Sequence, residues 1–255
     1  MAEENAARTV KSDEKLLRIL SAIRQKEVTG ITELAEELEF AKSTIHSHLA
    51  TLEKYGFITR FGDEYHIGLR FLDYGIYSRG QRQIFQAARE RVDELAAETG
   101  ERVWCIAEEH DQAVYLYSAE GEHAVHTHEN VGRHASLHHI AAGKAILAHL
   151  PHERVTEILD HTGMDRHTPN TITDREELER ELEAIRERGV AFNHQESMEG
   201  LHAIGAPIKR TGEGVYGAIS IGGPAHRLTE DKLENELTDL LLATANEIEI
   251  NVRHL

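Results

Sequence analysis

Hydrophobic residues recur every three to four positions in three segments near the start of the chain, which predicts three helices. The first covers residues 13–26. The second, residues 33–40, follows Thr32, whose hydroxyl can cap the first helical turn. The third begins near residue 42 and ends at Gly56. The inward positions are Leu16, Leu17, Leu20 and Ile23 in the first helix, Leu34, Ala35 and Leu38 in the second, and Ile45, Leu49 and Leu52 in the third.

The outward face of the third helix carries short polar side chains rather than a row of arginines. Hydroxyl groups there can donate to phosphates or base edges, and the helix N-terminus favours phosphate. A predicted hairpin follows, with strands near 58–61 and 65–67 around a turn at Gly62. Three helices and a hairpin form a winged helix-turn-helix, which reads DNA with its third helix. The predicted DNA contacts are Thr32, Lys42, Ser43, Thr44, His46, Ser47, Thr51, Lys54 and Arg60.

The same three-helix pattern also occurs in modules that only bind other proteins, so this alternative stays open. The segment 69–80 continues as a linker helix with apolar residues at Leu69, Leu72 and Ile76. Such a stripe packs either on its own domain or on a twin subunit. A further helical pattern runs from Gly80 to Gly100.

Beyond residue 101 the pattern changes to strands. The runs "RVWCIAEEH" and "AVYLYSAE" predict a hairpin, and "HAVHTHE" a third strand. A helix is predicted over "SLHHIAAGKAILAHL", and the capping box Thr173–Glu176 predicts another helix up to Gly189. Three strands ("VAFNHQES", "HAIGAPIKR" and "GVYGAISIGG") and a closing helix over 229–252 complete the pattern. Strands joined by short turns and flanked by helices indicate an antiparallel α+β domain.

Charge separates the two parts of the chain. The net charge of the 255 residues is −17. Residues 1–80 hold 11 Lys and Arg against 13 Asp and Glu, whereas residues 81–255 hold 17 against 32. The acidity therefore lies mostly outside the predicted DNA-binding part. Because the chain is rich in acidic residues and poor in lysine, its composition is typical of proteins from halophiles, which need a high net charge to stay in solution.

Cellular compartment and redox state follow from two further features. Cys105 is the single cysteine, which excludes an intrachain disulfide and fits a reducing cytoplasm. No apolar run reaches the roughly 18 residues of a membrane span, and the polar N-terminus does not resemble a signal peptide. We therefore expect a cytoplasmic protein without a membrane partner.

Histidines gather in the stretch "HAVHTHENVGRHASLHH". If a strand forms there, His126 and His128 lie on the same side and could bind zinc or nickel. A metal-binding protein or metal-dependent enzyme is thus an alternative to a DNA-binding regulator. Neither HExxH nor any other zinc-hydrolase spacing is present, and the chain lacks GxSxG and P-loop motifs. We therefore expect neither catalytic residues nor a cofactor.

Several phrases in fixed order resemble one protein family. They are "ITELAEELEFAKSTIHSHLATLEKYGFI", "YHIGLRFLDYG", "LHHIAAGKAILAHLP", "MEGLHAIGAPI" and "GAISIGGPAHRLT". The chain is similar to the isocitrate-lyase-regulator (IclR) family of transcription factors. The resemblance covers residues 13–250. It implies a winged helix-turn-helix over 1–70, a linker helix over 71–80 and a GAF-like effector domain over 81–255. It also implies dimers or tetramers on double-stranded DNA and a small effector such as an organic acid or a sugar acid.

The resemblance further implies which residues surround the effector. By position these are Ala141, Ala142, Asn193, Leu201, Ala203, Ser220 and Gly222. The family pattern has an acid at Asn193, a thiol near Ala203 and a hydroxyl near Gly222, so the effector of this chain differs in its polar contacts. Small residues at these positions leave space for a ligand. Trp104 and Cys105 are candidates for a cavity wall, with ordinary core packing as the alternative.

Overall fold

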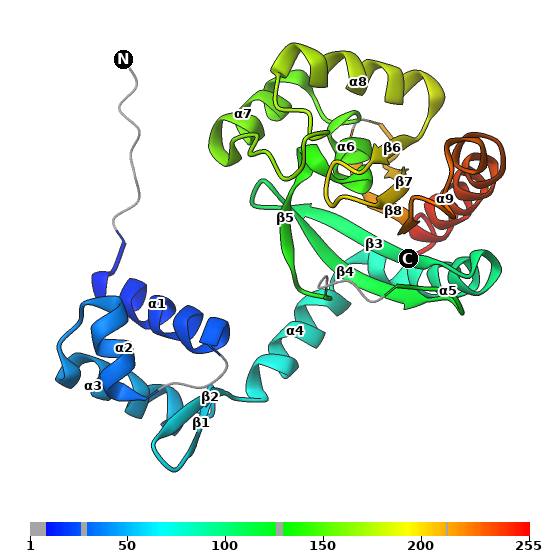
Figure 1. Cartoon of the computed structure of the whole chain (residues 1–255). Coiled ribbons are helices and arrows are strands. Elements are labelled where there is room, and N and C mark those ends of the chain that lie inside the picture. The colour runs from blue at the N-terminus through cyan, green and yellow to red at the C-terminus, as the bar shows by residue number, and fades with distance from the viewer. Residues whose placement is uncertain (1–8, 27–29, 126–129, 213) are drawn as a thin grey trace. The chain divides into compact units, whose positions relative to one another are not determined.

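The computed structural model describes residues 9–26, 30–125, 130–212 and 214–255. The chain divides into two compact units, Met1–Ser78 and Arg79–Leu255, each with its own apolar core (Figure 1). Among the described residues no helix combines the length and apolarity of a bilayer span.

The first unit is a winged helix-turn-helix. Its elements are the helices α1 (Lys11–Lys26), α2 (Ile31–Leu38) and α3 (Lys42–Lys54), and the antiparallel strands β1 (Ile58–Phe61) and β2 (Glu64–Ile67). The predicted inner faces of α2 and α3 are confirmed, because Leu34, Ala35, Leu38, Ile45, Leu49 and Leu52 are all buried.

The predicted inner face of α1 is wrong at one position. Leu17 is 61% exposed, and the buried residues are Ile19, Ala22 and Ile23. Positions 19, 22 and 23 share one helical face, whereas Leu17 lies two residues before Ile19 and therefore about 200° away around the helix. Packing of α1 against α2 and β2 therefore determines which side of the helix is buried.

The start of α2 also differs from the prediction. Gly30 is the N-cap residue, and its backbone N–H donates to a carboxylate oxygen of Glu33 at 3.4 Å. Thr32 therefore lies inside the first turn instead of capping it, and its Oγ1 accepts a hydrogen bond from Nζ of Lys42 at 3.1 Å. The predicted end of α3 is confirmed, since Gly56 follows the helix with φ +74°.

The linker helix α4 (Arg70–Gly80) has no buried residue. Its first turns are fixed by Phe57, whose ring centroid lies 5.0 Å from that of Phe71 and 5.6 Å from that of Tyr74. The predicted stripe is exposed at Leu69, Leu72 and Ile76. This apolar surface is unusual for a helix in water.

The second unit is a six-stranded antiparallel sheet between two layers of helices (Figure 1). The strand order is β5 (His134–Ser136), β4 (Gln112–Glu120), β3 (Arg102–Glu109), β8 (Val215–Pro224), β7 (Leu201–Lys209) and β6 (Ala191–His194). One face packs on α5 (Gln83–Thr99) and α9 (Thr238–Val252), which a π-helix (Lys232–Leu237) precedes. The other face packs on α6 (Ala141–Leu147), α7 (His152–Thr162) and α8 (Arg175–Arg188). The predicted α+β class is confirmed.

Three local predictions in this unit are corrected. Residues 123–125 form no strand, the rest of the predicted strand lies outside the described residues, and the edge of the sheet is formed by β5 instead. The predicted helix near 137 is a 3₁₀ turn (Leu137–His139) and then α6, because Ile140 is extended. Asp174 caps α8 by accepting from the backbone N–H of Glu177 at 2.9 Å, one residue later than the predicted capping box.

Candidate functional site

A row of four residues across the sheet forms one side of a cavity in the second unit. The strand register places Asn193 beside Ala203, Ala203 beside Gly222, and Gly222 beside Arg102. Side chains paired in this way point to the same face of a sheet. The two middle residues are too small to fill the space between the amide and the guanidinium, so the sheet is hollowed there.

The start of α6 forms a second side of the cavity, and a glycine allows it to approach the sheet. A Cβ atom on Gly205 would lie 2.7 Å from the backbone of Ala141 and Ala142, so any side chain in β7 would push α6 away. The cavity has a volume of about 90 Å³. All seven residues that the family resemblance implied line it, namely Ala141, Ala142, Asn193, Leu201, Ala203, Ser220 and Gly222.

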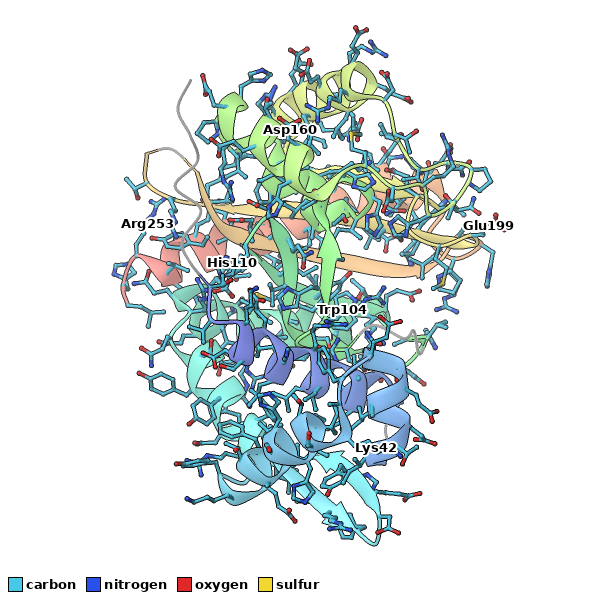
Figure 2. The ribbon with its side chains drawn as sticks, turned by 90° about the vertical axis from the view of Figure 1, so that its left-hand side faces the viewer. Lys42, Trp104, His110, Asp160, Glu199 and Arg253 are labelled. Carbon is cyan, nitrogen blue, oxygen red and sulfur yellow. The ribbon has the colours of Figure 1, made fainter. Side chains whose placement is uncertain are left out.

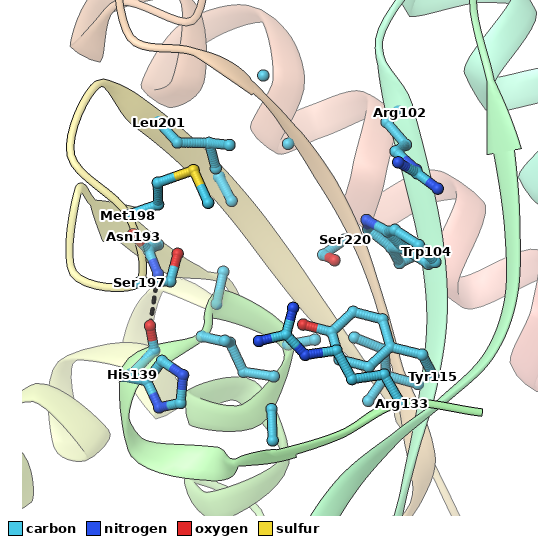
Figure 3. A pocket seen from close by; sticks show the side chains of 18 of the residues that line it. Arg102, Trp104, Tyr115, Arg133, His139, Asn193, Ser197, Met198, Leu201 and Ser220 are labelled. Atoms are coloured by element: carbon cyan, nitrogen blue, oxygen red, sulfur yellow. Dashed lines mark hydrogen bonds between the residues drawn. The ribbon is translucent and has the colours of Figure 1, made fainter. Parts of the chain in front are cut away.

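Aromatic and cationic side chains line the opposite side (Figure 3). Trp104 and Tyr115 meet edge to face with ring centroids 4.9 Å apart, and the Arg102 guanidinium lies 4.3 Å from the Trp104 ring. Trp104 therefore forms a wall as well as part of the core. Cys105 faces the other side of the sheet, where burial raises the pKa of its thiol to about 12, so it is an inert core residue.

The cavity is cationic within a strongly acidic domain. None of the described residues that line it is acidic, while Arg102, Arg133, His139 and His167 all contribute to its walls. Arg102 is paired with Glu120 at 3.3 Å, whereas Arg133 is exposed and forms no ion pair with any described residue. An exposed guanidinium that no described carboxylate neutralises, at the mouth of such a cavity, favours an anionic ligand, above all a carboxylate.

Sequence reasoning missed Arg133, His139 and His167 because they lie on connecting segments. One signal was available. Residues 130–152 contain no Asp or Glu, although the chain holds 45 acidic residues. Such a gap in an acidic chain indicates a surface that must not repel an anion. The other lining residues not predicted are Arg102, Ile106, Tyr115, Val125, Ala135, Ile140, Ser197, Met198 and Gly223.

His139 is an uncharged histidine in the wall of this cavity. His139 is 5% exposed and stacks on His167, with ring centroids 3.8 Å apart and an interplanar angle of 20°. Burial is the main cause that lowers the pKa of His139 to about 3, and the neighbouring His167, His138 and Arg133 contribute to this shift. The imidazole therefore offers hydrogen bonds and no charge.

A buried ion pair lies behind the cavity. Lys144 of α6 is 1% exposed, and its Nζ donates to Oε1 of Glu196 at 2.6 Å and lies 3.5 Å from Oε1 of Glu181. Burial raises the pKa of Glu196, an effect that Lys144 partly offsets. The backbone N–H of Glu196 donates to Asn193 Oδ1 at 2.9 Å. The pair thus fixes the segment that carries Ser197 and Met198.

The predicted DNA contacts lie on one exposed surface of the first unit. Lys42 is the first residue of α3 (Figure 2), and the outward hydroxyls of Ser47 and Thr51 donate to backbone carbonyls one turn earlier, each at 2.9 Å. Their lone pairs remain available as acceptors. The other side chains on this surface, all exposed except the half-buried Thr44, are Thr32, Ser43, His46 and Lys54.

Arg60 of the wing is held by its own turn. Its Nε donates to the carbonyl oxygen of Gly62 at 2.7 Å, and its Nη2 lies 3.0 Å from Oδ1 of Asp63. The carboxylate of Asp63 is completely exposed, so the guanidinium remains accessible beside it. The hairpin therefore presents a cation and an anion together to solvent.

The metal-site alternative has no support in the described part of the chain. No group of three or more His, Cys, Asp or Glu residues there is arranged to hold a metal ion. The two histidines predicted for such a site, His126 and His128, lie outside the described residues.

Comparison with known proteins gives consistent matches over the whole chain. Residues 14–61 match the IclR helix-turn-helix domain, and residues 78–250 match the bacterial transcriptional regulator IclR C-terminal domain. The chain is 31% identical over 255 residues to a protein of Halobacterium salinarum named HTH-type transcriptional regulator ArcR, covering 98% of this chain and 97% of that protein. It is 30% identical over 240 residues to the transcriptional regulator KdgR of Dickeya chrysanthemi, covering 93% and 79%.

Solved structures agree with these matches. The crystal structure of the Thermotoga maritima IclR is 31% identical, with a TM-score of 0.79 over 95% of this chain and 98% of that chain. An IclR homologue from Microbacterium hydrocarbonoxydans, crystallised with 4-hydroxybenzoate, is 20% identical with a TM-score of 0.81 over 96% and 100%. The latter shows likeness of fold alone.

Proposed function

The chain belongs to the IclR family of transcriptional regulators, and from this premise we propose which surfaces read DNA and which kind of molecule controls the reading. The family joins a helix-turn-helix domain to a C-terminal effector-binding domain. We assign residues 1–70 to operator binding, 71–80 to the linker and 81–255 to effector binding. No catalytic activity is proposed, and the site of action is the cytoplasm.

The outward side of α3 reads the operator, and the wing contacts the DNA backbone beside it. The support is the exposed hydroxyl, imidazole and ammonium groups of α3 and the accessible guanidinium of Arg60. Hydroxyls and His46 make base-edge contacts in the major groove, while Lys42, Lys54 and Arg60 neutralise phosphates. Thr32 contributes through its contact with Lys42.

The effector is a small organic acid. The observation that carries this proposal is a cavity whose described lining holds no acidic residue and whose Arg133 has no ion pair within the described part of the chain, in a domain whose acidic residues far outnumber its basic ones. A carboxylate meets Arg133, and the carbon skeleton packs against Trp104 and Tyr115. The ligand named for the Microbacterium homologue, 4-hydroxybenzoate, is likewise an organic acid.

The exposed stripe of α4 couples the two functions through a second copy of the chain. Leu69 is 84% exposed and Tyr77 69%, and a water-exposed apolar stripe on a linker between domains is stabilised by pairing with its twin. A dimer or tetramer then presents two winged units at a fixed spacing to a palindromic operator. The effector changes DNA affinity only if it binds one arrangement better than the other.

DNA fragments captured by the purified protein identify the operator, and fluorescence anisotropy then measures its affinity with and without organic acids. We expect operator affinity to disappear in a chain lacking residues 1–80. We also expect that any organic acid that binds, as detected by a change in Trp104 fluorescence, shifts the operator affinity of the full-length protein. Trp104 is the single tryptophan, so the signal comes from the cavity. Operator binding by the truncated chain would contradict the assignment.

A further inference from the structure

His139 is nearly buried at the cavity, yet its side chain makes no hydrogen bond to any described residue. The residue lines the cavity and is 5% exposed. Its Nδ1 is enclosed by protein and has no partner among the described residues, so Nε2, which also has none there, is the nitrogen open to a ligand. A neutral imidazole has one donor and one acceptor, and leaving either of them buried without a hydrogen bond destabilises the protein. A side chain kept in this state inside a ligand cavity indicates that the ligand supplies the missing hydrogen bond.

The surrounding residues hold this imidazole in place without using its nitrogens. The ring stacks on His167 and meets the edge of His138, with centroids 5.0 Å apart. Asn193 Nδ2 donates to the backbone carbonyl oxygen of His139 at 2.7 Å. His138 in turn donates from Nε2 to the carbonyl oxygen of Asp165 at 3.1 Å, which anchors the segment that carries His167. Such a preorganised contact loses little entropy when a ligand binds.

Two other polar side chains of the cavity already have tasks of their own. The amide of Asn193 is used at both ends, by His139 and by the backbone N–H of Glu196. Arg133 is a cation and recognises the carboxylate. The neutral ring of His139 is therefore suited to a hydroxyl group, which can donate and accept and so satisfies either tautomer.

The size of the cavity limits the acid. An engineered cavity of about 150 Å³ admits benzene, whereas the volume here is about 90 Å³. A ligand enclosed by these walls is thus smaller than a six-membered ring, which corresponds to roughly two to four carbon atoms. The 4-hydroxybenzoate of the Microbacterium homologue exceeds this size.

We propose that the effector is a short hydroxycarboxylic acid and that His139 determines this specificity by hydrogen bonding to the hydroxyl while Arg133 binds the carboxylate. This inference rests on the proposed function, namely that the cavity binds organic acids. It adds the second polar group of the ligand and the residue that recognises it.

The test compares two acids of three carbons that differ by one hydroxyl, lactate and propionate, by titrating Trp104 fluorescence of the full-length protein. We expect lactate to bind at least about tenfold more tightly, as one satisfied buried hydrogen bond implies. In His139→Phe, which keeps a ring to stack on His167, the advantage of lactate should fall to about threefold or less. His152→Phe, at an exposed position outside the cavity, should keep the full advantage.

Two results would overturn this inference and leave the proposed function intact. One is equal affinity for lactate and propionate in the natural protein, and the other is an unchanged preference in His139→Phe. If no carboxylate, including 4-hydroxybenzoate, alters the fluorescence, the inference and the organic-acid proposal fail together. Should His139→Phe not fold, ¹⁵N shifts of the His139 ring in the natural protein decide the matter. They should move with lactate and not with propionate, and identical responses would contradict the proposal.

Discussion

Asn193 and His139 are joined by a hydrogen bond from the Asn193 side-chain Nδ2 to the His139 carbonyl oxygen at 2.7 Å. Asn193 lies in β6 and His139 in the 3₁₀ turn before α6, so the bond connects two walls of the cavity. An aspartate has the shape of asparagine but cannot donate from this position. Asn193, which departs from the family pattern, therefore positions His139, which we infer to recognise the effector.

We predict that Asn193→Asp lowers effector affinity at least about tenfold and destabilises the domain by roughly 1–3 kcal/mol, because two buried oxygen atoms would face each other. Fluorescence titration and urea denaturation, both followed through Trp104, measure the two effects. Asn170→Asp is the matched control, since the amide of Asn170 donates to the carbonyl oxygen of His194 at 3.0 Å on the exposed surface. A cost no larger than that of the control would contradict the role of Asn193.

Gly222 offers a way to fill the cavity without disturbing the fold. A Cβ atom there would meet Ala203 Cβ at 3.7 Å, an ordinary contact. Gly222→Ala should therefore leave stability unchanged or raise it by about 0.4–1 kcal/mol, while the added methyl group reduces effector affinity at least about tenfold. Gly205→Ala, whose Cβ would overlap the backbone of α6, should instead destabilise the domain by about 1–3 kcal/mol. Urea denaturation and ligand titration of both variants distinguish these outcomes.

Lys144 and Glu196 form a buried pair that is sensitive to the loss of one partner. Lys144→Met should destabilise the effector domain by about 3–5 kcal/mol at neutral pH, because Glu196 would be left as an unpaired buried charge. The double variant Lys144→Met/Glu196→Gln should recover a large part of this loss. Urea denaturation of the single and double variants tests this, and equal losses in both would argue against the ion pair as the cause.

The free energy of unfolding should fall on acidification at pH values well above those at which carboxylates become protonated. Burial lowers the pKa of His138, His139, His149 and His194. Below pH 6.5 the unfolded chain therefore binds protons that the folded chain excludes, and stability falls as pH falls. His139 alone, with its pKa lowered to about 3, should contribute a loss of ~2 kcal/mol between pH 7 and pH 5.

Urea denaturation at these two pH values measures the loss, and His139→Phe should reduce it by ~2 kcal/mol. An equal pH dependence in His139→Phe and the natural protein would show that His139 does not exclude the proton.

The spacing of hydrophobic residues was sufficient to predict the parts of the fold that local packing determines. The inner face of α3 follows from Ile45, Leu49 and Leu52, because three residues at i, i+4 and i+7 can share only one side of a helix. It failed at Leu17, because spacing alone does not determine which side of α1 contacts α2 and β2. It also placed the caps of α2 and α8 one or two residues away from Gly30 and Asp174.

The small residues that line the cavity could be predicted from the sequence, whereas the arginines and the histidines that line it could not. Ala203 and Gly222 belong to strands with a recognisable family pattern, so their positions could be transferred. Arg133, His139 and His167 meet only because β5, the 3₁₀ turn and the segment after α7 converge. Neither spacing nor composition encodes such convergence, although the missing acids in 130–152 mark its centre.

The affinity for DNA should depend only weakly on the salt concentration. The α3 and wing surface offers few phosphate-neutralising cations, and the affinity falls with log salt with a slope of roughly 0.9 per neutralised phosphate. We therefore expect operator binding to persist at high salt.

Asp63 of the wing should weaken DNA binding, because its carboxylate lies beside the cation of Arg60. Asp63→Asn should raise the affinity several-fold because it removes a negative charge 3.0 Å from Arg60 beside the phosphates.

Arg60→Gln should lower affinity equally for all sequences and reduce the salt slope by about 1 per bound winged unit. Fluorescence anisotropy with the captured operator over a range of KCl concentrations measures both quantities. Asp160→Asn, which removes a carboxylate paired with Arg175 in the second unit, is the matched control and should change neither. An operator affinity that collapses steeply above low ionic strength would mean that many more cations contact the DNA than α3 and the wing provide.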